Sequence, residues 1–171
     1  MEQCYIRFMD NNLVEIWLRK DPVRWLSGIL AGILSGIVTT VAAMALANHF
    51  GLEHWFPVKL FATITLGSSA LDMGMNTGPL LAGFLTIEAI SVFFGFIFGH
   101  FTGTNSMKAL LPMGLVWGAF SWIFIWNLFL QSFTTILAAR ISSGAVFPIC
   151  MVFGLMMASV ALFDKAFRSA R

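Results

Sequence analysis

Charged residues are scarce in this chain, and long apolar runs are abundant. Asp, Glu, Lys and Arg make up only 11% of the 171 residues, whereas 58% are hydrophobic. The mean hydropathy is +0.85. A soluble domain carries roughly 25% charged residues, and a small fold buries only about two-thirds of its surface. Because so much apolar surface must face lipid, the composition predicts an all-α integral membrane protein.

Cysteine, clustered positive charge and nucleotide-binding motifs are also scarce or missing. Of the two cysteines, Cys4 precedes the first apolar run and Cys150 lies within the last, so neither a disulfide nor a cysteine metal pair is expected. A net charge of +2, with basic residues at the ends of apolar runs, argues against a nucleic-acid surface. The sequence has no P-loop, GxSxG or GxGxxG motif in a strand–helix context. We therefore expect a protein that is not an enzyme.

Four apolar runs are long enough to cross a bilayer as helices. About 20 apolar residues suffice to span a hydrocarbon core of about 30 Å. The runs predict a four-transmembrane-helix bundle over residues 25–163, followed by a basic cytoplasmic tail at 164–171. The predicted spans cover residues 25–47, 80–101, 109–130 and 145–163.

Two further segments are expected to lie at the membrane surface. Residues 1–24 mix apolar and charged side chains and predict an N-terminal amphipathic helix on the cytoplasmic side. Residues 57–71 form an apolar run that is too short to span, which predicts an interfacial or re-entrant helix between spans one and two.

The short helix at 57–71 is also expected to have two faces. Leu60, Phe61 and Ile64 fall on one side of a helical projection, whereas Lys59 and Thr63 fall off it. The pattern is typical of a helix that lies on the membrane or dips into it.

The distribution of lysine and arginine predicts the orientation. If the short helix does not cross the membrane, Lys59 and Arg140 lie on one side, where either could pair with Asp72. Because cytoplasmic loops carry the excess of basic residues, both termini are expected in the cytoplasm, in a multi-pass protein of the bacterial inner (cytoplasmic) membrane. The remaining basic residues share the cytoplasmic side: Arg7, Arg19, Lys20, Arg24, Lys108, Lys165, Arg168 and Arg171.

Small residues recur at helical spacing in three of the predicted spans. Rows of this kind let the backbones of two membrane helices approach closely. They predict helix-packing faces. The rows are Gly28, Gly32 and Gly36; Ser91, Gly95 and Gly99; and Gly114 with Gly118.

Glu88 is the acidic residue that lies well inside a predicted span. A carboxylate at that depth is costly in lipid, so it should face protein or water. By depth, Thr39 and Thr40 of span one and Ser121 of span three could form an intramembrane polar site with it. Glu88 could serve as a proton or ion site, or as a neutral group that donates a hydrogen bond and locks the helices together. The second reading is favoured because no other intramembrane acid or base completes a relay.

His49, Glu53 and His54 form an outer-side polar cluster. The two histidines are five residues apart, which is not the i, i+4 pairing of strong zinc motifs. His100 lies at the opposite end of span two, so no two histidines match in depth as a haem would require. We expect no metal and no intrinsic cofactor, but we do expect bound lipids.

Three functions are compatible with these features. The first is a non-catalytic accessory or structural subunit of a larger bacterial membrane complex, such as a respiratory or electron-transfer assembly (a terminal oxidase is one example). The second is a small oligomeric proton or ion channel, or transporter, that uses Glu88. The third is a membrane assembly factor. Expected partners are membrane lipids and other integral membrane subunits, or further copies of the chain, but not nucleic acid.

Overall fold

The computed structural model describes residues 20–72, 76–130 and 143–170. All regular structure in these residues is helical, and four stretches are long and apolar enough to cross a membrane. The predictions of an all-α fold and of a multi-pass membrane protein are thereby confirmed. The amphipathic helix predicted at the N-terminus falls mainly in residues 1–19, outside the described part. The four candidate spans are Pro22–His49, Thr77–Phe101, Met107–Asn127 and Gly144–Ser169.

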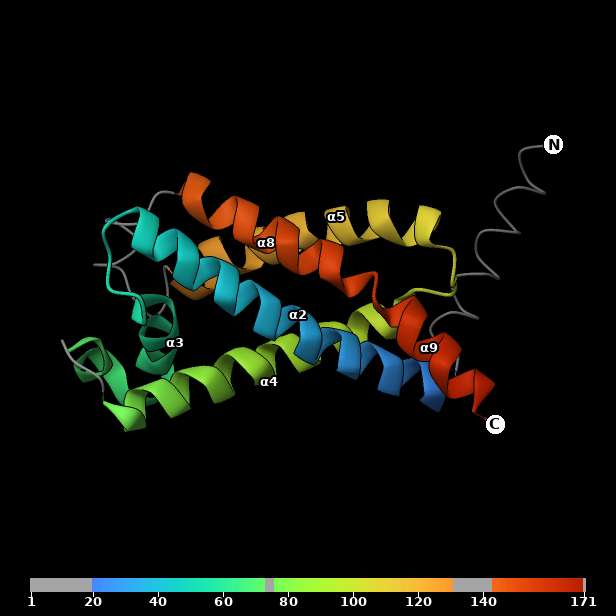
Figure 1. The fold of residues 1–171 in the computed structure, drawn as a ribbon, viewed down its shortest axis with the longest axis horizontal. Helices are drawn as coiled ribbons and strands as arrows, with labels where there is room; N and C mark the ends of the chain where they lie inside the picture. Colours follow the sequence, from blue (N-terminus) through green and yellow to red (C-terminus); the bar gives the residue numbers. More distant parts are fainter. Residues whose placement is uncertain (1–19, 73–75, 131–142, 171) are drawn as a thin grey trace.

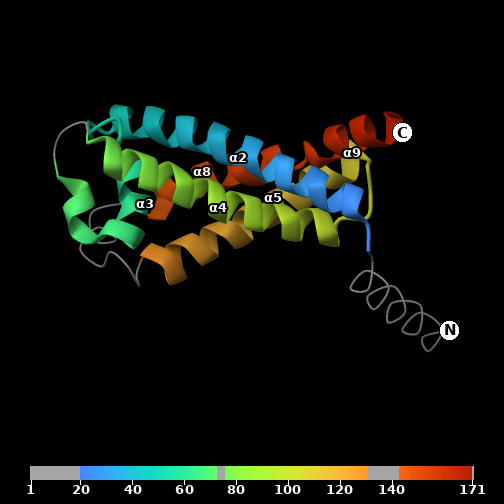
Figure 2. The ribbon, with the colours of Figure 1, turned by 90° about the horizontal axis from the view of Figure 1, so that it is seen from below.

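The long helices form an antiparallel bundle built from two closely packed pairs (Figures 1 and 2). Helix α2 (Pro22–His49) packs along α4 (Thr77–Phe101), and α5 (Met107–Ile123) packs along α8 (Ser143–Met157). Contacts between α2 and α8 join the two pairs. The last helix, α9 (Val160–Ser169), returns to the beginning of α2 (Figure 1).

Glycines bring the backbones of α2 and α4 into contact. A Cβ atom added at Gly28 would lie 2.4 Å from the carbonyl oxygen of Gly95, and one at Gly32 would lie 2.4 Å from that of Ser91. A Cβ at Gly99 would lie 2.9 Å from the carbonyl oxygen of Arg24. No larger side chain fits at these positions unless the helices separate. The small-residue rows of spans one and two therefore face each other.

The second pair uses the same device. A Cβ added at Gly114 would lie 2.3 Å from the carbonyl oxygen of Gly154, and one at Gly118 would lie 2.6 Å from that of Cys150. A Cβ added at Gly154 would lie 2.1 Å from the carbonyl oxygen of Gly114. These three glycines thus determine how closely the backbone of α5 packs against that of α8.

Aromatic side chains fill the space between the two pairs. The Phe94 ring of α4 lies 5.8 Å from Trp117, 5.3 Å from Phe124 and 6.3 Å from Phe153 between centroids. Trp117 also contacts Phe98 at 5.8 Å. Helices α4 and α5 therefore meet through large rings, which hold their backbones farther apart than those of either glycine pair.

The third and fourth spans are not uninterrupted α-helices. Residues Phe124–Leu130 form a π-helix, η2, directly after α5. The fourth span turns between α8 and α9, where the Ala158 and Ser159 amides donate to carbonyls only three residues back. That turn redirects α9 toward the beginning of α2.

The short helix between spans one and two packs through the face that carries its lysine. Helix α3 (Phe56–Leu66) continues as a 3₁₀-helix, η1 (Gly67–Leu71). Lys59 and Thr63 are buried, together with Val58 and Ala62. The predicted apolar side is only half-buried: Leu60, Phe61 and Ile64. An apolar side chain gains little by leaving lipid, whereas a lysine needs a protein partner.

Candidate functional site

Glu88 lies against the small-residue row of α2. A Cβ added at Gly36 would lie 3.0 Å from Glu88 Oε1 and 2.7 Å from Ser91 Oγ. The Glu88 side chain is half-buried, and its Oε2 atom is enclosed without a hydrogen-bond partner in the described residues. The carboxyl group therefore reaches the interface between the two helices, as its intramembrane position requires.

The other predicted members of the polar site gather near this level of the bundle without bonding to Glu88. The hydroxyl oxygens of Thr39 and Thr40 are buried and have no partner in the described residues. Ser121 of α5 donates to the carbonyl of Trp117 at 2.8 Å. Within the part of the chain that the structure describes, no hydrogen bond joins Glu88 to any of the three. The hydroxyls of Thr39 and Thr40 and one carboxylate oxygen of Glu88 therefore have no hydrogen-bond partner in the described residues.

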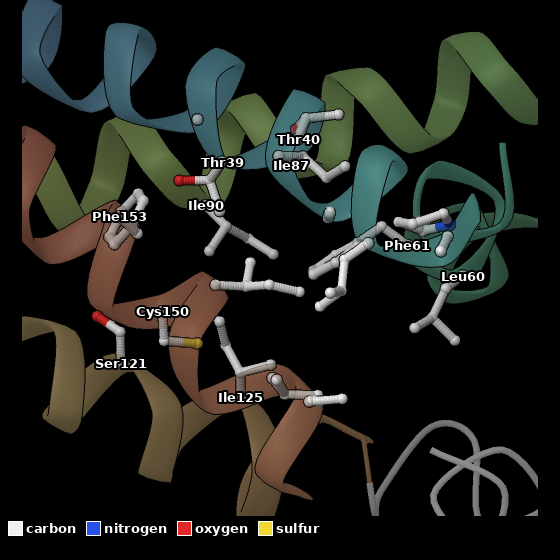
Figure 3. A pocket seen from close by; sticks show the side chains of 18 of the residues that line it. Thr39, Thr40, Leu60, Phe61, Ile87, Ile90, Ser121, Ile125, Cys150 and Phe153 are labelled. Atoms are coloured by element: carbon white, nitrogen blue, oxygen red, sulfur yellow. The ribbon is translucent and has the colours of Figure 1, made fainter. Parts of the chain in front are cut away.

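An apolar cavity of about 440 Å³ opens beside this polar group. It lies among the C-terminal half of α2, the beginning of α3, the middle of α4, and α8 with the end of α5 (Figure 3). Thr39, Thr40 and Ser121 are lining residues, and so are Gly36 and Ser91, the neighbours of Glu88. The cavity was not foreseen from the sequence, because its existence depends on how far the two helix pairs separate.

A second feature that sequence reasoning missed is a charged network at the end of the bundle where α2 begins. Arg24 is only 2% exposed. Its guanidinium donates to the carbonyl of Thr102 at 3.0 Å and to that of Thr104 at 2.7 Å, and it also bonds to the Asn105 side chain. Arg24 thereby ties the first span to the connector between spans two and three.

Asp164 extends the network to the last helix. Its Oδ2 atom accepts from Asn105 at 2.6 Å and from Arg168 at 2.9 Å, and it lies 3.8 Å from Arg24. Arg168 also donates to Asp21 at 2.6 Å. The ion pair between Asp21 and Arg168 shows that the start of span one and the last helix lie at the same end. The sequence signal for this network was the presence of opposite charges at the ends of predicted spans that share one side of the membrane.

The predicted outer-side polar cluster does not converge. His49, Glu53 and His54 are all exposed, and Glu53 pairs instead with the buried Lys59 at 2.7 Å. Lys59 also donates to the backbone carbonyl of Asp72 at 3.0 Å, so it meets Asp72 through the backbone rather than the carboxylate. Among the described residues, no group of three His, Cys, Asp or Glu side chains could hold a metal ion.

The remaining candidate residues are His100 and the two cysteines. His100 accepts a hydrogen bond through Nδ1 from Trp25 Nε1 at 3.0 Å, at the opposite end of the bundle from His49 and His54. Cys150 is buried and its thiol is free, whereas Cys4 lies outside the described residues.

Comparisons with known proteins supply no relative for this chain: no family model, no curated protein and no solved structure matches it.

Proposed function

We propose that this chain is a non-catalytic accessory subunit of a larger bacterial membrane complex, such as a respiratory or electron-transfer assembly. The observation that supports this proposal is an exposed stripe on α5 and η2. Val116 is 72% exposed, and Phe120 and Ile123 are exposed on the same side. Asn127, exposed further along the same stripe, donates to the Ile123 carbonyl one turn back at 3.2 Å.

The stripe favours a protein neighbour over lipid alone. Among the four candidate spans, the one that carries it has the smallest buried share. Lipid tails offer no hydrogen-bond partner to an asparagine, whereas a second membrane helix does. The buried charges Arg24, Asp164 and Lys59 are already paired inside the chain. A partner would thus meet an apolar helix face with one amide near its outer end.

The proposal predicts that the chain purifies with other subunits. Extraction from native membranes in a mild detergent should give a discrete assembly, whose other integral membrane proteins can be identified by mass spectrometry. A photo-crosslinking residue at Val116 should yield one specific heavier product. The same residue at Leu85, which is 63% exposed on α4, is the matched control and should yield none. A chain that migrates alone, as its own oligomer, would contradict the proposal.

A proton or ion site at Glu88 is the second candidate function. It is favoured by the enclosed, unpartnered Oε2 atom of Glu88 and by the unpartnered hydroxyls of Thr39 and Thr40 on the facing helix. A proton could transfer among these oxygens, or a partly dehydrated cation could bind them in succession. The arrangement lacks a second described intramembrane acid, which is why this function ranks below the first.

Replacing Glu88 with Gln tests that candidate. If Glu88 carries the proton or ion, Glu88→Gln should reduce flux into liposomes by at least about tenfold, because the amide cannot release a proton or bind a cation as a carboxylate does. Glu53→Gln, at the exposed outer carboxylate that pairs with Lys59, is the control and should leave flux unchanged. Equal flux in Glu88→Gln and the parent chain, or no flux in either, would remove this function.

A further inference from the structure

A groove of about 350 Å³ lies between the end of α4 and the first half of α5, on the lipid-facing side of the bundle. Thr102 is the lining residue with a hydroxyl, which already donates to the Phe98 carbonyl at 2.7 Å and accepts from Arg24 at 3.1 Å. The groove therefore presents mainly hydrocarbon, which suits an acyl chain. Its other walls include Phe98, Phe101, Pro112, Met113 and Val116.

Lys108 continues the line of the groove toward the end of the bundle. It lies in the first turn of α5, one turn before Pro112 and two before Val116, so the three residues share one side of the helix. Because the candidate span begins at Met107, the lysine lies at the level of the lipid headgroups. Pro112 lies about 6 Å deeper, at about 1.5 Å per residue. An apolar track thus runs inward from a cation at the membrane surface.

The positive charge of Lys108 is not neutralised within the described part of the chain. Its side chain is exposed and makes no ion pair or hydrogen bond with another described residue. The described acids at this end are already paired: Asp164 lies against Arg24 and Arg168, and Asp21 pairs with Arg168. The sequence predicts that this end faces the cytoplasm, and anionic lipids of the cytoplasmic leaflet attract basic residues near its surface. The charge complementary to Lys108 is therefore available in the membrane.

We propose that this groove holds one phospholipid with an anionic headgroup. An acyl chain lies along the apolar walls, and the phosphate group lies beside the Lys108 ammonium. Lys108 provides the selectivity, because a zwitterionic lipid fills the same walls but brings no net negative charge to the lysine. The inference does not rest on the accessory-subunit proposal: the groove runs from Val116 toward Thr102, whereas the exposed stripe runs from Val116 the other way to Asn127.

The test is lipid binding to the purified full chain, measured by native mass spectrometry from detergent micelles. The probes are dioleoylphosphatidylglycerol, which is anionic, and dioleoylphosphatidylcholine, which is zwitterionic. Because the two lipids have the same acyl chains, the ratio of their dissociation constants for the first bound lipid isolates the headgroup. We expect phosphatidylglycerol to bind about fivefold more tightly, the usual contribution of one basic residue near an anionic membrane surface.

Two pairs of variants locate the site. Lys108→Gln should remove the preference for phosphatidylglycerol and leave the affinity for phosphatidylcholine unchanged, whereas Lys108→Arg should keep the preference. Lys165→Gln is the matched control, because Lys165 is an exposed lysine at the same end of the bundle but belongs to α9. Met113→Trp places a larger side chain in the groove and should weaken both lipids, whereas Leu111→Trp, at an exposed position of α5 outside the lining, should weaken neither.

Three results would overturn the proposal. One is equal affinity of the parent chain for the two lipids. Another is a preference for phosphatidylglycerol that survives in Lys108→Gln, or that Lys165→Gln lowers as much, because the charge that is recognised would then lie elsewhere or be spread over the whole end. The third is lipid affinity that Met113→Trp leaves unchanged, because the groove would then be unused. Since Lys108 is exposed, its variants should fold, and their result stands even if Met113→Trp does not fold.

Discussion

An alanine at position 95 is expected to destabilise the bundle by about 1–3 kcal/mol, the usual cost of overpacking a closely packed interior. The added methyl group would lie 2.3 Å from the Gly28 carbonyl oxygen and 2.7 Å from the Gly32 Cα. Both are backbone atoms, so α2 and α4 must move apart along their whole contact. At about 2–4 °C for each kcal/mol in a chain of this size, thermal unfolding in detergent should shift down by roughly 2–12 °C.

Gly78→Ala is the matched control for Gly95→Ala. Both glycines belong to α4, but a Cβ at Gly78 meets no atom within 4 Å. That substitution should be neutral or stabilising by up to about 1 kcal/mol, because alanine favours the helix. Circular dichroism during heating would compare the two variants. If both unfold at the same temperature as the parent chain, the backbones of α2 and α4 do not touch at Gly95.

Replacing Arg24 with Met is expected to lower the free energy of unfolding by about 3–5 kcal/mol, because it breaks a buried ion pair by removing one partner. The variant would leave the Thr102 and Thr104 carbonyls without their donor. It would also remove one of the two cations near Asp164, which is only 1% exposed. An uncompensated buried charge costs more than a whole ion pair that is replaced by apolar groups. Unfolding in detergent with increasing denaturant would measure the loss.

Arg168→Met tests whether the burial of Arg24 is the reason for the large loss of stability expected in Arg24→Met. Arg168 contacts the same carboxylate, but its side chain is 48% exposed, so its removal should cost about 1 kcal/mol or less. The double variant Arg24→Met/Asp164→Asn should recover part of the stability lost in Arg24→Met, because it removes the stranded charge as well. Equal losses in Arg24→Met and Arg168→Met, with no recovery in the double variant, would show that the network does not depend on the buried guanidinium.

Much of the helical architecture was predictable because it depends on local composition. A run of about 20 apolar residues can satisfy its backbone in lipid only as a helix, so the four spans followed from hydropathy. The rows at Gly28 and Gly95 were also readable, since small residues spaced four apart mark the face that another helix approaches. The ends of the spans were less predictable: the π-helix at Phe124 and the turn at Ser159 leave no mark in the apolar pattern.

The candidate site was predictable in part. Depth along the spans placed Thr39, Thr40 and Ser121 at one level, and in the structure all three line the same cavity. Depth could not reveal which hydroxyls are already bonded. Ser121 donates to its own helix, whereas Thr40 does not.

The sequence by itself determined that this protein is helical, that it crosses the membrane several times, and which glycine faces are available for close packing. Only the tertiary structure decided which charges pair, which side of α3 is buried, and where the bundle is hollow. The physical reason is that span formation depends on backbone satisfaction in lipid, a property of each segment alone. The pairing of Arg24 with Asp164 and the space beside Thr40 depend instead on how far and at what level separate helices meet.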